Sequence, residues 1–363
     1  MSQNYIPYKL SEVSEIIMGQ SPKSSSYNNK NIGLPLLNGA SDYKGYIFKP
    51  RKFTSKPLRI AEKGDILIGI RATIGNLSIC NNKYCIGRGV AAIRVKSKID
   101  KIFLLYLLNT KIESLINDSH GAIIKGIKKA DLHNMELLLP PLDEQKRIVK
   151  RLDESFEKID KAIANTKKNI ENTKKLFQSK LNEIFTYANK KYDSKKWKEV
   201  LQIKSGRSQK NVENKNGKYP ILGSAGKIMS YSDEYICEEE TTIIGRKGNI
   251  NDPKFINSKF WNVDTAFGLE AFNDLNKKFL FMFCLSYDFT KMDKGSGRPS
   301  LVKSDLLEIK IPLPPIKEQA NFVKTLEKLS VHKKNLESTY NQKLLDLEEL
   351  KKSILNKAFK GEL

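Results

Sequence analysis

The chain has 363 residues, 39% of them hydrophobic and 29% charged, a composition that provides apolar surface for two or three cores and excludes an intrinsically disordered protein. Its longest apolar runs, 102–108 and 279–285, are much shorter than the ~20 residues that cross a membrane, and no apolar leader follows Met1, so we expect a cytoplasmic protein. Lys and Arg outnumber Asp and Glu by 64 to 41, and the net charge of +23 indicates a polyanionic partner, most often nucleic acid, although a Lys-rich proteome would also produce it.

A first globular part is predicted over residues 1–138. Residues 64–70 have the pattern of a short strand between Gly-rich turns, and 101–117 that of an aromatic-rich helix, which together indicate a small α/β domain with irregular sheets. Three Gly-containing loops of this part carry residue types that hold phosphates or read base edges, although an ordinary solvated turn is the alternative for any single residue. The candidate nucleic-acid contacts are Gln20, Lys23, Arg71, Thr73, Asn76, Lys125 and Lys128.

A long helical segment is predicted over 139–191. It begins with Leu-Pro-Pro-Leu-Asp-Glu-Gln at 139–145, which favours an abrupt helix start because proline is tolerated only in the first turn. Apolar residues then recur every seven positions, as in a coiled coil. One row holds Val149, Phe156, Ile163, Ile170, Phe177 and Ile184, and the other holds Leu152 and Ile159 before Thr166 and Thr173 weaken it.

A second globular part is predicted over 192–315, with a strand at 241–245 and a helix at 275–290. Its loops repeat the basic and polar composition of the first part, and we match 246–249 with 71–76. Segment 223–227 resembles a phosphate-binding loop but lacks the four-residue gap and the following Ser or Thr. The candidate nucleic-acid contacts here are Arg207, Gln209, Lys210, Arg246, Lys247, Arg298 and Lys303.

The last segment, 316–363, is predicted to be a second long helix. Its apolar rows are Leu326, Tyr340, Leu347 and Ile354 on one side and Leu329, Leu336 and Leu350 on the other, interrupted by Lys333 and Lys343. Each helix of roughly 45 residues would measure about 65 Å, and neither can bury its apolar stripe alone. We expect the second helix to pack antiparallel on the first. The alternative is that each helix packs on its own globular part.

The two halves of the chain are copies of each other. The heptapeptide at 139–145 recurs as Leu-Pro-Pro-Ile-Lys-Glu-Gln at 313–319, and Lys-Ala-Asp-Leu at 129–132 recurs as Lys-Ser-Asp-Leu at 303–306, both with an offset of 174 residues. The copies keep the helical pattern but differ within the globular parts. We therefore expect the helices to share one role and the globular parts to have two different ones.

The excess positive charge lies mainly in the globular parts, and no motif for chemistry accompanies it. Residues 1–142 and 192–317 carry +16 of the net +23. Four Cys and three His, with only Cys80 and Cys85 close together, are too few for a zinc site, and we expect reduced thiols. No dinucleotide-binding fingerprint, adenine-methyltransferase tetrapeptide or nuclease carboxylate cluster occurs. We expect a non-catalytic binding protein with no metal and no cofactor of its own.

These features together resemble the specificity subunit of type I restriction-modification systems. The resemblance rests on the doubled helix start at 139–145 and 313–319 with the Lys-x-Asp-Leu before it, on Gly-Arg-Lys-Gly at 245–248, and on the final Lys-Ala-Phe-Lys-Gly-Glu-Leu at 357–363. It covers essentially the whole chain. The fold that it implies is α+β, with two small α/β target recognition domains separated by two long antiparallel coiled-coil helices in a pseudo-two-fold tandem duplication.

The resemblance also implies a function and a set of partners. The chain would bind double-stranded DNA, each domain reading one half of an asymmetric bipartite site, and the helices would set the spacer between the halves. The helices would also dock two adenine-methyltransferase (M) subunits carrying S-adenosylmethionine, while restriction and translocase (R) subunits would use ATP and Mg. The resemblance assigns no base-contacting residue. Each domain is short for the family, which leaves the length of each half-site open.

Two other classes of function stay open on the sequence alone. One is a self-contained DNA-modifying enzyme, a methyltransferase or nuclease, which the missing cofactor and metal motifs disfavour. The other is a coiled-coil scaffold or an RNA-binding protein, which the concentration of positive charge in the globular parts disfavours.

Overall fold

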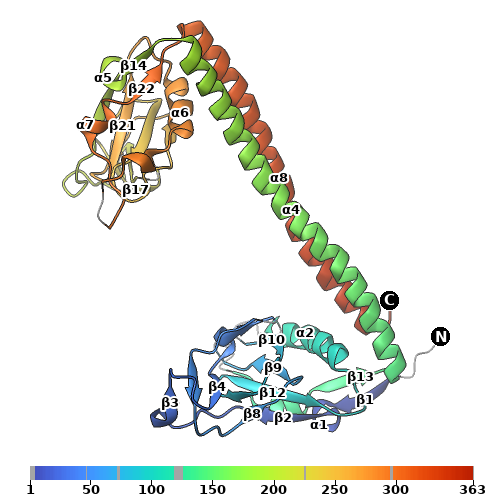
Figure 1. Ribbon diagram of the computed structural model, residues 1–363. Helices are drawn as coiled ribbons and strands as arrows, with labels where there is room; N and C mark the ends of the chain where they lie inside the picture. The colour runs from blue at the N-terminus through green and yellow to red at the C-terminus, as the bar shows by residue number, and fades with distance from the viewer. Residues whose placement is uncertain are drawn as a thin grey trace. The chain divides into compact units, whose positions relative to one another are not determined.

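The computed structural model describes residues 5–45, 47–71, 74–117, 126–224, 226–294 and 297–362. It consists of two compact units. Unit 1 comprises Met1–Ala164 and Leu344–Leu363, and unit 2 comprises Asn165–Lys343. Two long helices, α4 (Leu142–Lys191) and α8 (Ile316–Lys360), each contribute one part to each unit (Figure 1). The predicted fold class, two small α/β domains with two long helices, is confirmed.

Unit 1 is built on a four-stranded antiparallel sheet, β10-β9-β12-β2, and a five-stranded sheet, β3-β7-β4-β11-β8, in which β4 and β11 are parallel. Strands β1 and β13 form a separate antiparallel pair, as do β5 and β6. The described strands of this unit are β1 (Ile6–Lys9), β2 (Ser14–Met18), β3 (Tyr27–Asn28), β4 (Leu34–Leu37), β5 (Tyr43–Lys44), β6 (Ile47–Phe48), β7 (Lys52–Thr54), β8 (Ile60–Ala61), β9 (Ile66–Gly69), β10 (Leu77–Ile79), β11 (Tyr84–Ile86), β12 (Val90–Val95) and β13 (Glu136–Leu139). The α-helices of its globular part are α1 (Leu10–Val13), α2 (Lys101–Asn117) and α3 (Lys129–His133).

The central strands of unit 1 are buried on both faces, which explains why their sequence is a continuous apolar run rather than an alternating one. Ile66 and Ile68 of β9 pack in one cluster with Phe103 of α2, whereas Leu67 of β9 and Ala92 of β12 pack in a second cluster with the five-stranded sheet. The predicted helix at 101–117 is confirmed as α2. The four-stranded sheet therefore lies between α2 and the second sheet, and its strand ends lead into the loops.

Unit 2 repeats this architecture with sheets β15-β21-β18-β19 and β17-β16-β20 and a β14–β22 pair. Its elements are β14 (Ser194–Lys196), α5 (Trp197–Val200), β15 (Leu201–Ser205), β16 (Tyr219–Leu222), β17 (Ile228–Ser232), β18 (Thr241–Gly245), β19 (Lys254–Ile256), β20 (Trp261–Asn262), β21 (Ala266–Ala271), α6 (Lys277–Ser286), α7 (Lys303–Leu306) and β22 (Lys310–Pro312). The helix predicted at 275–290 is shorter than expected. It ends at Ser286, and Phe289–Met292 form a separate 3₁₀ turn that the Asp288 side chain caps.

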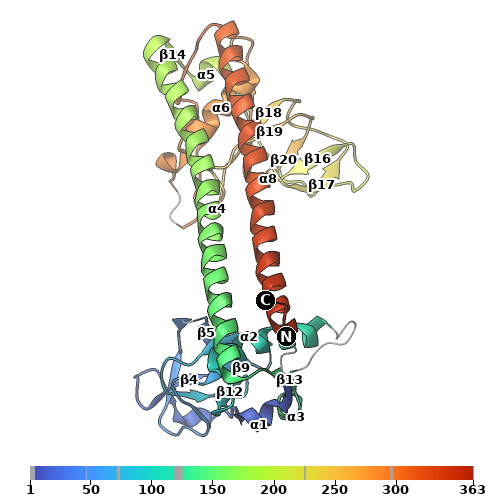
Figure 2. The same cartoon turned by 90° about the vertical axis from the view of Figure 1, so that its right-hand side faces the viewer.

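The helices pack against each other within each unit, and they run antiparallel in unit 2 (Figure 2). There Lys333 lies over the ring of Phe177, and Phe322 contacts Tyr187 further along α4, so one helix ascends as the other descends. In unit 1, the Lys351 ammonium lies 4.9 Å from the ring centre of Phe156 and forms an ion pair with Asp160 at 2.8 Å. Each helix also packs on its own globular part, so the two packing modes predicted as alternatives occur together.

The second predicted apolar row of α8 is wrong in part. Leu336 and Leu350 remain 44% and 46% exposed, although the heptad pattern places them in the helix contact. Lys333, predicted to interrupt the row, lies instead on the covered side with its ammonium over an aromatic ring. A long Lys side chain can cover apolar surface with its methylene groups while its charge meets a ring face, which is why the pattern of apolar letters misplaced this row.

The Gln that ends each helix-start motif joins the helix to the globular part. In unit 1, Gln145 is 1% exposed, accepts a hydrogen bond from the Asp100 backbone N–H at 2.8 Å, and donates to the carbonyl oxygens of Pro140 at 2.9 Å and Lys98 at 3.3 Å. In unit 2, Gln319 makes the same contacts with Asn276, Pro314 and Asp274. We call each set of contacts a glutamine junction. It connects the first residues of a long helix to the start of α2 or α6.

The four cysteines are buried and unpaired. Burial raises the pKa of the Cys80 thiol to about 12, and burial raises that of Cys284 further above its ordinary value. Low reactivity follows, because the thiolate is the reactive form. Among the described residues, no helix is both long enough and apolar enough to cross a membrane.

Candidate nucleic-acid interface

The loops predicted to contact nucleic acid meet at one edge of the four-stranded sheet in unit 1. Neighbouring strands of this sheet are antiparallel, so the C-terminal ends of β2 and β9 lie beside the N-terminal ends of β12 and β10. Gln20, Arg71, Arg88 and Asn76 follow or precede these strand ends. Segment 126–128 joins them, because the Ile127 N–H donates to the Ile70 carbonyl at 2.9 Å. We call this set of loops the loop edge of unit 1.

A glycine brings the first loop close to its neighbour. A Cβ atom at Gly19 would lie 2.1 Å from the Gly87 carbonyl oxygen, so no side chain fits there. The tight approach lets the Gln20 backbone N–H donate to the Ile86 carbonyl at 2.9 Å. This bond fixes the backbone while the side chain of Gln20 and that of nearby Lys23 stay exposed. The side chain of Gln20 is therefore exposed beside a backbone position that this hydrogen bond ties to β11.

The other candidates of unit 1 differ in availability. Arg71 and Lys128 are exposed at the loop edge. Asn76 is not free to read a base, because its amide donates to the Tyr43 carbonyl at 3.2 Å and holds the β9–β10 turn to the β5–β6 pair. Thr73 and Lys125 lie outside the described residues.

Unit 2 forms an equivalent loop edge with different side chains. Gly206 takes the place of Gly19, since a Cβ there would lie 1.8 Å from the Val263 carbonyl oxygen. The Arg207 N–H donates to the Asn262 carbonyl at 3.0 Å, as Gln20 does to Ile86. The exposed Arg207 thus occupies the position that Gln20 has in unit 1.

The sheet register corrects our match of 246–249 with 71–76. Gly69 pairs with Val90 in unit 1, and Gly245 pairs with Ala266 in unit 2, so these glycines correspond and Arg71 corresponds to Lys247. Arg246 corresponds to the buried Ile70 instead. Its guanidinium lies 5.7 Å from the ring centre of Phe267 and donates to the Asp264 carbonyl at 3.3 Å, so it supports the loop rather than facing outward.

The remaining candidates of unit 2 lie around the same edge. Gly248 has φ +83°, a conformation that favours glycine, and the Arg298 guanidinium packs directly over it. The Gly248 N–H donates to the Pro299 carbonyl at 2.8 Å, which brings this strand end and the 297–302 segment together. The exposed or partly exposed side chains there are those of Gln209, Lys210, Lys247, Arg298 and Lys303.

Our sequence-based prediction missed Arg88, which is exposed between β11 and β12. Its backbone N–H donates to the Ser21 hydroxyl at 3.3 Å, so it lies beside the Gln20 loop. Asp264 occupies the corresponding position in unit 2, because Val90 corresponds to Ala266. The pattern Gly-Arg-Gly at 87–89 could have indicated this residue, but the neighbouring sequence does not show that it lies beside the other loops.

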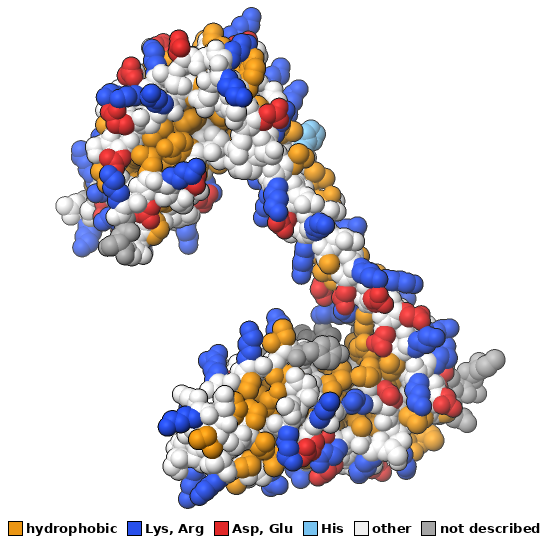
Figure 3. All heavy atoms as spheres, viewed as in Figure 1, with side chains coloured by type: hydrophobic (Ala, Val, Ile, Leu, Met, Phe, Trp, Pro, Cys, Tyr) orange, Lys and Arg blue, Asp and Glu red, His pale blue; other side chains and the backbone are white. Residues whose placement is uncertain are grey.

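The surface of both units carries mixed charge with a basic excess. Figure 3 shows Lys and Arg side chains over the globular part of each unit, with Asp and Glu among them. The loop edges contribute Arg71, Arg88 and Lys128 in unit 1 and Arg207, Lys247 and Arg298 in unit 2. Such edges can hold phosphates through Lys and Arg and read base edges through Arg and Gln. No three His, Cys, Asp or Glu side chains gather as a metal site would require in the described part of the chain.

The chain is similar to known proteins over most of its length. The family model of the type I restriction modification DNA specificity domain matches residues 3–172 and 179–346. The putative type I restriction enzyme MjaX specificity subunit of Methanocaldococcus jannaschii is 46% identical over 142 residues, which cover 38% of this chain and only 33% of that relative. The EcoKI specificity subunit of Escherichia coli (strain K12) is 24% identical over 422 residues, covering 100% of this chain and 90% of the relative.

Two solved structures share the fold. A chain from a structure that describes complex assembly and conformational transition of the type I R-M system has a TM-score of 0.83 at 19% identity, covering 100% of this chain and 99% of that one. The HsdS subunit from Thermoanaerobacter tengcongensis has a TM-score of 0.59 at 18% identity, with complete coverage of both chains. At these identities the likeness concerns the fold alone.

Proposed function

Because this chain belongs to the family of the type I restriction modification DNA specificity domain, two copies of which make up most of its length, we propose that it is the sequence-specific DNA-binding subunit of such a system. Unit 1 reads one half of an asymmetric bipartite site and unit 2 reads the other. One observation carries this proposal: the two loop edges have the same backbone but different side chains. Gln20 of unit 1 is equivalent in position to Arg207 of unit 2, and Arg88 of unit 1 is equivalent to Asp264 of unit 2. Equivalent backbone positions that carry different side chains suit the recognition of two different half-sites.

The helices, we propose further, set the spacer between the half-sites and dock two methyltransferase subunits. In support, α4 and α8 carry large apolar side chains that neither helix covers. Leu176, Val331 and Leu345 are 71%, 56% and 65% exposed. A methyltransferase subunit that packs on the helices would cover these side chains and remove them from water. In this arrangement S-adenosylmethionine belongs to the methyltransferase subunits, ATP and Mg to the restriction subunits, and this chain contributes no catalytic group.

Mapping of adenine methylation tests the proposed function directly. Long-read sequencing of cells with and without this gene is expected to show one bipartite motif that loses its methyl groups when the gene is deleted. The motif also supplies both half-sites and the spacer for the experiments below. An unchanged methylome in cells that express the methyltransferase subunits contradicts the proposal.

Substitution of one exposed arginine at each loop edge tests the division of labour. Arg71→Ala is expected to relax one half-site and Arg207→Ala the other, each weakening binding to the cognate duplex by ~1–3 kcal/mol, because the substitution removes a bidentate hydrogen bond to guanine. Binding to duplexes with every single-base change measures this. Arg151→Ala on the exposed side of α4 is the control and should leave both half-sites unchanged. Equal weakening on all duplexes would show phosphate binding instead of base reading.

A further inference from the structure

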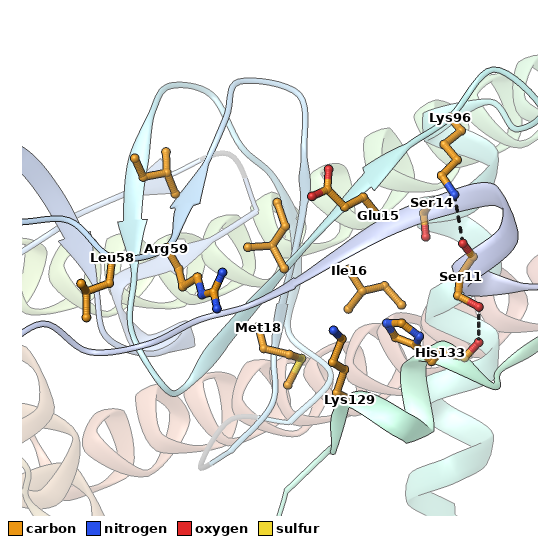
Figure 4. Close-up of a pocket in the computed structure, with 12 residues that line it drawn as sticks. Ser11, Ser14, Glu15, Ile16, Met18, Leu58, Arg59, Lys96, Lys129 and His133 are labelled. Carbon is orange, nitrogen blue, oxygen red and sulfur yellow. Dashed lines mark hydrogen bonds between the residues drawn. The ribbon is translucent and has the colours of Figure 1, made fainter.

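Unit 1 has a groove beside its loop edge that the base-reading role leaves unexplained. The groove has a volume of about 890 Å³ and runs along β2, the outermost strand of the four-stranded sheet. Figure 4 shows that Arg59 and Lys129 lie on either side of Met18, with His133 and Lys96 further along. Met18 directly precedes the Gly19-Gln20 loop, and Lys129 directly follows Lys128. The groove therefore continues from the loop edge.

The side chains that line this groove make it basic. Arg59, Lys96 and Lys129 face a single carboxylate, that of Glu15. Glu15 lies 3.5 Å from the Arg94 guanidinium, which pairs more closely with Asp65 at 2.9 Å, so three cations of the groove face one carboxylate and a positive excess remains. The Lys96 ammonium is held in place by the carbonyl oxygens of Ser11 at 3.1 Å and Glu12 at 3.3 Å. Figure 4 shows this contact with Ser11.

The corresponding region of unit 2 has fewer cations without an acidic partner. Its Lys259 ammonium lies 4.4 Å from the Tyr235 ring centre but is paired with Glu238 at 2.8 Å. In unit 1 the backbone N–H of Lys96 donates to the carbonyl of Val13, the last residue of α1. In unit 2 the backbone N–H of Phe272 donates to the carbonyl of Val200, the last residue of α5, so Phe272 takes the place of Lys96. Ala61 pairs with Tyr84 in unit 1, and Cys237 pairs in the same way with Phe260 in unit 2, so Ala61 and Cys237 are equivalent. Two residues before each of them, Tyr235 takes the place of Arg59.

Two further differences reduce the charge beside β15. The repeat offset puts Leu307 in the place of His133. Lys198 and Lys204, which flank or belong to β15, are paired with Glu308 at 2.7 Å and Glu270 at 3.6 Å. Of the groove's basic side chains, only Lys129 keeps a basic counterpart, Lys303. The gathering of basic side chains at this groove is thus a feature of unit 1, although Gln202 in the place of Glu15 also removes one negative charge from unit 2.

We propose that the groove of unit 1 binds phosphate groups of the DNA strand that flanks its half-site, and that unit 1 thereby supplies sequence-independent affinity that unit 2 does not. This inference rests on the proposed function, since it places the duplex at the loop edge. Three cations along one open groove suit a polyanion such as the phosphate backbone of DNA. Each cation that contacts a phosphate displaces counterions, so the contribution of the groove depends on salt.

The test is the salt dependence of DNA binding by the full-length chain. The variant combines Arg59→Gln, Lys96→Gln and Lys129→Gln, three exposed positions at which a neutral side chain leaves the core intact. The control combines Lys167→Gln, Lys168→Gln and Lys174→Gln on α4, which removes the same charge elsewhere. Fluorescence anisotropy with a cognate and a scrambled duplex from 50 to about 300 mM KCl gives the slope of log Kd against log salt. Thermal unfolding of each variant verifies the fold.

The groove variant is expected to lower the slope by about 0.9 for each phosphate that the groove no longer neutralises, about 2 to 3 in total, and to weaken cognate and scrambled duplexes by the same factor. The reciprocal variant Tyr235→Arg with Phe272→Lys in unit 2 is expected to raise the slope. A slope for the groove variant equal to that of the α4 control overturns the inference, as does weakening confined to the cognate duplex. Failure of the wild-type chain to distinguish cognate from scrambled DNA would instead overturn the proposed function.

Discussion

Insertion of seven residues into both long helices, after Ala164 in α4 and after Lys343 in α8, is expected to lengthen the spacer of the methylated site by about three base pairs. The chain is divided between the two units at these positions of both helices, so the insertion is expected to leave the packing within each unit unchanged. Seven helical residues add about 10.5 Å at 1.5 Å each, and base pairs are spaced about 3.4 Å apart. A whole heptad also keeps the apolar rows of both helices in phase.

Methylome sequencing of cells that express the double insertion measures the outcome. The letters of both half-sites are expected to stay the same, because neither loop edge is altered. Insertion into α4 alone is the control, and it should abolish methylation at every spacer length because the two helices no longer match. An unchanged spacer in the double insertion would contradict a spacer-setting role for the helices, and changed half-site letters would contradict the assignment of base reading to the loop edges.

Replacement of the buried glutamine of a junction is expected to have the largest effect on stability. Gln145→Leu leaves the Asp100 N–H and the carbonyl oxygens of Pro140 and Lys98 without their partner. The contact with Pro140 is buried and the other two are partly buried. A buried polar group left unsatisfied costs ~1–3 kcal/mol and a partly exposed one costs less, so the free energy of unfolding should fall by about 3 kcal/mol. For a unit of this size that corresponds to a drop in Tm of roughly 10 °C.

Scanning calorimetry of the full chain with and without the substitution provides the measurement. Gln319→Leu should produce the same effect in unit 2, since its three hydrogen bonds are equivalent. Gln202→Leu, at an exposed position of β15, is the matched control and should change stability by less than ~0.5 kcal/mol. A Tm for Gln145→Leu within about 2 °C of the control would show that the junction carries no stability.

Local patterns in the sequence were sufficient to predict that the chain contains two copies of one architecture, each with a long helix. The heptads predict α4 and α8 because every backbone hydrogen bond of a helix joins residues four apart, so the information is local. The helix-start motif predicts two abrupt starts for the same reason, and the offset of 174 residues shows that the fold is built twice. The motif did not reveal what its Gln does. That residue contacts Asp100, which lies 45 positions away in the sequence.

Tertiary structure alone decided which loop residues face outward. The sequence matched Arg71 with Arg246, but the strand register shifts the match by one residue, and Arg246 turns toward Phe267 while Lys247 takes the exposed place. A shift of one residue in a strand moves a side chain to the opposite face, and the pairing partner that sets it lies far along the chain.

The basic groove depends on the tertiary structure in the same way. Arg59, Lys96 and Lys129 belong to three separate segments, each unremarkable among 64 basic residues. By itself, the sequence determined the duplicated helices and the glycine turns, which depend on contacts between near neighbours. Only the tertiary structure revealed the loop edges, the exposed leucines of α8 and the groove. These features depend on strand pairing and helix packing, which bring together residues that are not regularly spaced in the sequence.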